Sequence, residues 1–141
     1  MILFYVKSDN YKLKVAADMV PRFFEQLKVV DLPMTFNHTK DRCGDVYLKI
    51  KRVDSLLITV TTYRPWNPWT KAIAYAQNNT IYVNERKLNS LEIADYVGNF
   101  CHETMHLLGY QHKGNYVTEY NLRTVPYVIG SLAEAWARSH G

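Results

Sequence analysis

The 141-residue sequence predicts an α+β fold, because segments with strand-like alternation and segments with the spacing of amphipathic helices both occur along it. Apolar side chains make up 48% of the chain, which is enough to bury one core without disulfide bonds. No linker, repeat or low-complexity segment divides the sequence. We therefore expect a single domain that spans residues 1–141.

The first elements are expected to be a strand and a helix. Residues 2–6 are rich in strand-forming side chains. Residues 18–30 carry apolar side chains at helical spacing, and Pro33 closes that helix. The apolar positions of this helix are Met19, Phe23, Phe24, Leu27 and Val30.

Four further strands are predicted in the middle of the chain. Each is a short segment that alternates or is rich in β-branched residues, at 46–50, 56–62, 71–76 and 80–84. Asn78 and Asn79 separate the last two and are typical turn residues. The last two strands are therefore expected to be joined by a tight turn.

Two helices complete the prediction. Asn89 or Ser90 can cap the first, in which one face carries Ile93, Val97, Phe100, Cys101, Thr104 and Leu108. We expect that face to pack on the sheet, with the thiol of Cys101 buried. A last helix over residues 129–139 is expected to bury its own apolar side chains.

Residues 102–112 read HETMHLLGYQH and fit the spacing HExxHxxGxxH. His102 and His106 lie four positions apart, so a helix would place them on one face, one turn from each other. Gly109 can adopt the left-handed conformation that ends a helix and returns His112 to the same place. Three histidines with one open position are typical of a catalytic Zn²⁺ site, and Glu103 can reach a water on that metal. The two other histidines of the chain, His38 and His140, are expected to be surface residues.

Charge and hydropathy narrow the range of partners. The net charge of +4 permits a nucleic-acid partner, but the basic residues are scattered and form no run. No segment has 18 or more consecutive apolar residues, so we expect no membrane-spanning helix. The N-terminus has no basic leader or cleavage site, so we expect a cytoplasmic protein, or a secreted one from which a leader has been removed.

From about residue 56 to residue 136 the chain resembles a minimal metzincin metalloprotease, the clan of matrix metalloproteinases, astacins and serralysins. Residues 71–76 (KAIAYA) resemble the family's edge strand, and residues 80–84 (TIYVN) resemble the strand that follows it. The resemblance implies a small twisted mixed sheet on an N-terminal helix and an active-site helix, followed by a short C-terminal subdomain that ends in a helix. It also implies zinc-dependent peptide hydrolysis with Glu103 as the general base, and an extended protein or peptide substrate bound by Ala74 and Tyr75.

One feature of the family is absent. Metzincins place a methionine turn beneath the zinc, but this chain has no methionine after Met105. Residues 124–128 (TVPYV) stand at the matching place, where Tyr127 or Val128 could take the methionine's role. Tyr127 could instead stabilise the oxyanion of the transition state, or pack in the core.

Several other residues allow more than one interpretation. Arg42, Cys43 and Gly44 resemble the inhibitory cysteine motif of matrix metalloproteinase propeptides, but we favour a turn that leads into the strand at 46–50. The aromatic loop 63–69 could form a cleft wall, although capping of the core is the simpler expectation. Glu119 and Glu134 are alternative metal ligands by similarity to another protease clan.

A second family offers a rival function. Small zinc proteins of ribosomal RNA maturation carry HGxxHxxGxxH, which the segment from His106 to His112 resembles in spacing. Those proteins have glycine where this chain has Glu103. The glutamate therefore favours an endopeptidase over a zinc-dependent endoribonuclease and over a binding module that keeps zinc for stability.

Overall fold

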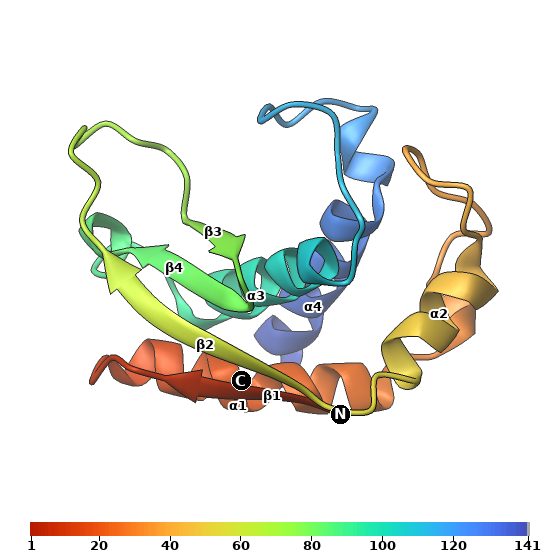
Figure 1. The fold of residues 1–141 in the computed structure, drawn as a ribbon, viewed down its shortest axis with the longest axis horizontal. Helices are drawn as coiled ribbons and strands as arrows, with labels where there is room; N and C mark the ends of the chain where they lie inside the picture. Colours follow the sequence, from red (N-terminus) through yellow and green to blue (C-terminus); the bar gives the residue numbers. More distant parts are fainter. Residues whose placement is uncertain (141) are drawn as a thin grey trace.

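The computed structural model describes residues 1–140 and has an α+β fold, as predicted. Four strands form one sheet in the order β1-β2-β4-β3 (Figure 1). The strands are β1 (Ile2–Val6), β2 (Leu56–Tyr63), β3 (Ala74–Gln77) and β4 (Thr80–Asn84). β1, β2 and β4 run parallel and β3 pairs antiparallel with β4, so the sheet is mixed and β3 is an edge strand.

Four α-helices accompany the sheet: α1 (Tyr11–Gln26), α2 (Cys43–Lys51), α3 (Ile93–Leu107) and α4 (Val125–His140). Short 3-10 turns, η1 (Val29–Asp31), η2 (Glu85–Lys87) and η3 (Asn121–Arg123), lie between these elements. α1 and α3 lie on the same side of the sheet, and α4 packs along α3 (Figure 1). Within residues 1–140 no helix is both long enough and apolar enough to cross a membrane.

The core lies between the sheet and these helices. It includes the inward residues of the central strands, namely Ile58, Val60, Ile81 and Val83, all fully buried. Alternate residues of the same strands point away from the helices, as the two-residue period of a strand requires. From α3 the core receives Val97, Phe100, Cys101 and Thr104, so the predicted packing face and the buried thiol are confirmed.

The predicted strand at 46–50 was wrong, because these residues belong to α2. Val46 and Ile50, four residues apart, are buried, whereas Leu48 between them is exposed. The carboxylate of Asp45 also accepts a hydrogen bond from the backbone N–H of Arg42 at 2.9 Å, which satisfies a free donor at the start of the helix. Alternating apolar residues over five positions fit both structures, and the helical cap distinguishes them.

Other element boundaries differ from the prediction. α1 begins seven residues before position 18, because the side chain of Asn10 accepts hydrogen bonds from the backbone N–H groups of Lys12 and Leu13. It ends at Gln26, well before Pro33, and Pro21 lies within it. The N-cap of α3 is Glu92, not Asn89 or Ser90, and α4 begins at Val125, not at position 129.

Of the predictions for two loops beside the sheet, one is confirmed and the other is wrong. Asn78 and Asn79 both have positive φ, +52° and +56°, which confirms the tight turn between β3 and β4. The aromatic loop 63–69 does not cap the core, since Trp66 is 97% exposed and Trp69 is 82% exposed. Only Pro65 of that loop is buried.

Candidate functional site

α3 presents the first two histidines and the glutamate of the motif. His102 and His106 project from the same face, and Glu103 lies one position after His102. The helix is held close to α4 at two glycines: a Cβ on Gly98 would lie 2.9 Å from the carbonyl oxygen of Gly130, and one on Gly130 would lie 3.2 Å from the Cβ of His102. This close approach fixes His102 against α4.

The end of α3 turns the chain back toward the same face. Gly109 has φ +101°, its N–H donates to the carbonyl of His106, and the N–H of Tyr110 donates to the carbonyl of Met105, both at 3.0 Å. These two bonds with a left-handed residue between them form a Schellman motif, which ends a helix and reverses the chain. The predicted role of Gly109 is therefore confirmed, and the reversal returns His112 to the other two histidines.

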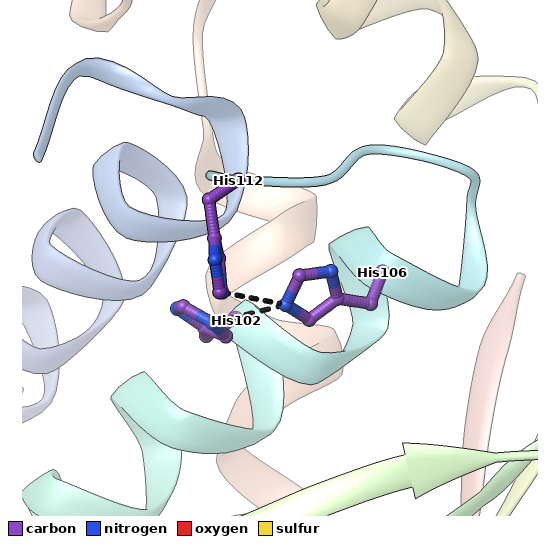
Figure 2. A group of neighbouring side chains, drawn as sticks. All are labelled: His102, His106 and His112. Carbon is purple, nitrogen blue, oxygen red and sulfur yellow. Dashed lines mark hydrogen bonds between the residues drawn. The ribbon is translucent and has the colours of Figure 1, made fainter. Parts of the chain in front are cut away.

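The three imidazoles converge through one nitrogen each (Figure 2). Nε2 of His106 lies 3.2 Å from Nε2 of His102 and 3.1 Å from Nε2 of His112. Two of the rings are oriented by a hydrogen bond at their other nitrogen. Nδ1 of His106 donates to the carbonyl of Tyr110, and Nδ1 of His112 donates to the carbonyl of Gly114, each at 2.8 Å. In neutral rings the Nε2 atoms of these two histidines therefore carry lone pairs, and the lone pairs face the common point.

This donor set fits a zinc ion. Ligands that hold Zn²⁺ tetrahedrally at ~2.0–2.1 Å lie roughly 3.3 Å from one another, close to the separations from His106. Burial, followed by the charges of His106 and His112, lowers the pKa of His102 to about 3, and burial also lowers the pKa of His106. Neutral imidazole is the form that binds a metal, so these environments favour ligation. Among histidine, cysteine and acidic residues in the range 1–140, these three histidines form the one group whose ligand atoms lie close enough together, within 4.8 Å, to hold an ion.

Glu103 is buried next to the histidines but is not one of the converging donors. Burial raises the pKa of its carboxyl to about 7. A carboxyl in this environment can hold a proton or release it near neutral pH, which is the property of a general acid and base. Glu103 thus has a different environment from the three converging histidines.

A cleft of about 1160 Å³ opens in front of the histidines. Its walls include the backbone and side chains of β3, with Ala74 and Tyr75, and the first turns of α4. Tyr127 lies on the α4 side, with its ring centroid 4.6 Å from that of His102 and 5.0 Å from that of His112. Burial and the nearby carboxylate of Glu103 raise the pKa of the Tyr127 hydroxyl. Tyr127 therefore lies at the site itself, half-buried, in the first turn of α4, which begins at Val125 shortly after the 3-10 turn η3.

Two supporting residues were not predicted from the sequence. Tyr110 supplies the carbonyl that orients His106, and its own hydroxyl donates to Oδ2 of Asp41 at 2.6 Å. Asn121 is fully buried and binds the backbone of the loop that follows His112. Tyr110 occupies a variable position inside the motif, and Asn121 lies nine residues after the last histidine of the motif. Neither position has a characteristic spacing that would identify the residue as part of the site.

The alternative ligands lie elsewhere. Cys43 is the first residue of α2 and does not belong to the histidine group. Glu119 is exposed, and Glu134 lines the same cleft but pairs with Arg138 at 3.3 Å and does not belong to the histidine group. His38 and His140 are exposed, as expected.

Models of protein families, curated proteins and solved structures were each compared with the chain, and none matched.

Proposed function

We propose that the chain is a zinc-dependent endopeptidase. The observation that carries this proposal is the combination of three converging histidine nitrogens with a buried glutamate that is not itself a ligand. A closed structural zinc site uses four protein ligands, whereas three leave one position free for chemistry. The resemblance of the motif to that of the metzincins supports the same conclusion.

His102, His106 and His112 would hold the ion. Zinc bound by three histidines supplies an acidic water and a positive charge that polarises a carbonyl group. Glu103 would accept a proton from that water at a carboxylate oxygen and donate it to the nitrogen of the leaving amine. Water adds to the carbonyl carbon and the C–N bond breaks, so the products are a new carboxylate and a new amine, without a covalent intermediate on the protein.

The edge strand β3 would position the substrate. One side of β3 pairs with β4, and its other side borders the cleft with free backbone groups. An extended peptide can add to such an edge as a further strand. The N–H of Asn84 donates to the carbonyl of Ile73, so in the same antiparallel ladder the backbone groups of Tyr75 face β4. The N–H and C=O groups of Ala74 and Ala76 would therefore hold the peptide, and Tyr75 would contribute its side chain to the cleft wall. This arrangement would fix a peptide bond in front of the histidines and favours an endopeptidase that binds extended chains.

Tyr127 would stabilise the transition state. Its ring lies against His102 and His112, and its pKa is raised, so the hydroxyl stays protonated and able to donate. A donor at this place can bind the oxyanion that forms when water adds to the carbonyl. We expect Tyr127→Phe to lower kcat by roughly 10- to 100-fold, with little change in KM.

The test is cleavage of a diverse peptide mixture by the zinc-loaded protein, read by mass spectrometry beside Glu103→Ala. New peptide termini are expected with the wild type only, while Glu103→Ala binds one zinc and loses about 10²–10⁴-fold in rate. Full turnover by purified Glu103→Ala would exclude this mechanism. Zinc binding without peptide cleavage would instead favour the ribonuclease function, for which a structured ribosomal RNA fragment is the matching substrate.

A further inference from the structure

The position of His112 is not fixed by the helix that carries the other two ligands. His112 lies in the segment between α3 and η3, which has neither helix nor strand. Tyr110 is buried before His112, but after His112 the apolar side chains of the segment give it no anchor, since Tyr116 is 81% exposed and Val117 is 69% exposed. A polar contact must therefore hold the backbone that positions His112.

The side chain of Asn121 makes that contact. Its Oδ1 accepts a hydrogen bond from the N–H of Lys113 at 2.8 Å, and its Nδ2 donates to the carbonyls of Lys113 at 2.6 Å and Tyr116 at 2.8 Å. Both amide N–H groups and the amide oxygen are thus used. Because Asn121 is fully buried, water does not compete for these bonds.

Asn121 is itself tied to the helix that packs on α3. Its N–H donates to Oγ1 of Thr118 at 3.1 Å, and its carbonyl accepts from Oγ1 of Thr124 at 2.6 Å. Thr124 is fully buried and immediately precedes α4. A continuous path therefore runs from α4 through Asn121 to the loop of the third ligand.

We infer that Asn121 is a positioning residue for His112. The amide fixes the peptide groups on both sides of Gly114, and the carbonyl of Gly114 accepts the Nδ1 hydrogen bond of His112 at 2.8 Å. This bond sets which nitrogen of His112 is free and where it points. The inference rests on the metal site of the proposed function, but it does not depend on peptide hydrolysis.

Asn121→Asp tests this role with little change in shape. The substitution replaces two N–H donors with an oxygen that faces the carbonyls of Lys113 and Tyr116. We expect zinc affinity, measured by competition with a chelating dye, to fall by roughly 10- to 100-fold. Asn115→Asp is the matched control, because it adds the same charge to an exposed side chain of the same loop, and it should keep the wild-type affinity.

Cobalt substitution gives a readout that general destabilisation does not move. The visible spectrum of bound Co²⁺ reports the number of nitrogen ligands, so Asn121→Asp should shift it toward the spectrum of His112→Ala. In the His112→Ala background, Asn121→Asp should cost no further zinc affinity, because the residue acts through His112. Equal losses in the two backgrounds would overturn the inference.

The possible failures can be told apart. If the wild type binds no zinc, the proposed function and this inference both fail. If the wild type binds zinc and Asn121→Asp binds it equally well, only the role of Asn121 fails. Should Asn121→Asp not fold, Thr118→Val removes only the acceptor of the Asn121 N–H; its zinc affinity is expected to fall, and an unchanged value would overturn the inference.

Discussion

The hydroxyl of Tyr110 donates a 2.6 Å hydrogen bond to Oδ2 of Asp41, which lies 69 positions earlier in the chain. The backbone carbonyl of the same tyrosine orients His106. Nζ of Lys49, on α2, lies 4.7 Å from the centre of the Tyr110 ring. The segment before α2 and α2 itself therefore support the loop between the second and third histidines, although they contribute no ligand.

Removal of this hydroxyl should weaken both the fold and the metal site. Tyr110→Phe leaves the Asp41 carboxylate without its donor, and we expect a loss of about 1–2 kcal/mol in the free energy of unfolding. Urea unfolding of the zinc-free and zinc-loaded protein measures this loss. We expect a larger loss with zinc bound, because the lost hydroxyl bond loosens the backbone whose carbonyl orients His106. Tyr116→Phe, on an exposed ring, is the control and should change neither value.

Zinc should stabilise the protein through the three histidines. An ion that binds only the folded state adds about 2.7 kcal/mol at a hundred times its Kd, which raises Tm by on the order of 10 °C in a chain of this size. Addition of a chelator should reverse the rise. His106→Ala should abolish the response to zinc, whereas His140→Ala, at the exposed end of α4, should keep it. A response that survives in His106→Ala would place the zinc elsewhere.

The helix that carries the site could be predicted from the sequence because its signals are local. The spacing of His102, His106 and Gly109 requires only that residues near one another adopt a helix and its usual end, and both are present. The turn at Asn78 and Asn79 is local in the same way. Short-range geometry is therefore sufficient to place two of the three histidines and the chain reversal.

Other features depend on contacts that sequence spacing does not encode. The alternation of Val46, Leu48 and Ile50 fits a strand as well as a helix, and packing against α1 and η1 buries Val46 and Ile50 and leaves Leu48 exposed. The partnership of Asp41 with Tyr110 joins segments far apart in the chain. Such pairs follow from the tertiary fold, so they could be found only once the elements were placed.

The close crossing of α3 and α4 predicts that glycine-to-alanine substitutions at two helical positions change the stability of the protein unequally. A Cβ on Gly98 would lie 2.9 Å from the backbone oxygen of Gly130, so Gly98→Ala must separate the helices at the level of His102. We expect destabilisation of about 1–3 kcal/mol in denaturant unfolding, despite the better helix propensity of alanine. Gly44→Ala in α2 meets no atom within 4 Å and should be neutral or stabilising by up to about 1 kcal/mol. Equal effects at the two glycines would contradict the close crossing.

The stability of the fold should decline at alkaline pH through Tyr96. This residue is fully buried on α3, and its hydroxyl donates to the carbonyl of Lys87 at 3.3 Å. Burial, followed by the charge of Asp95, raises its pKa from 10.0 to about 12. The unfolded chain therefore loses this proton first, so the contribution of Tyr96 is complete below pH 10 and is lost as pH rises from about 10 to 12.

The expected decline from Tyr96 is about 1.4 kcal/mol in the free energy of unfolding per pH unit over that interval. Tyr96→Phe should be less stable than the wild type at neutral pH by about 1 kcal/mol, because the carbonyl of Lys87 loses its donor. Above pH 10 its stability should fall less steeply, and the two curves should approach one another. Urea unfolding at successive pH values between 8 and 12 measures both slopes. Parallel curves over this range would show that the Tyr96 hydroxyl has the same pKa in the folded and unfolded chain, against the burial that the structure gives it.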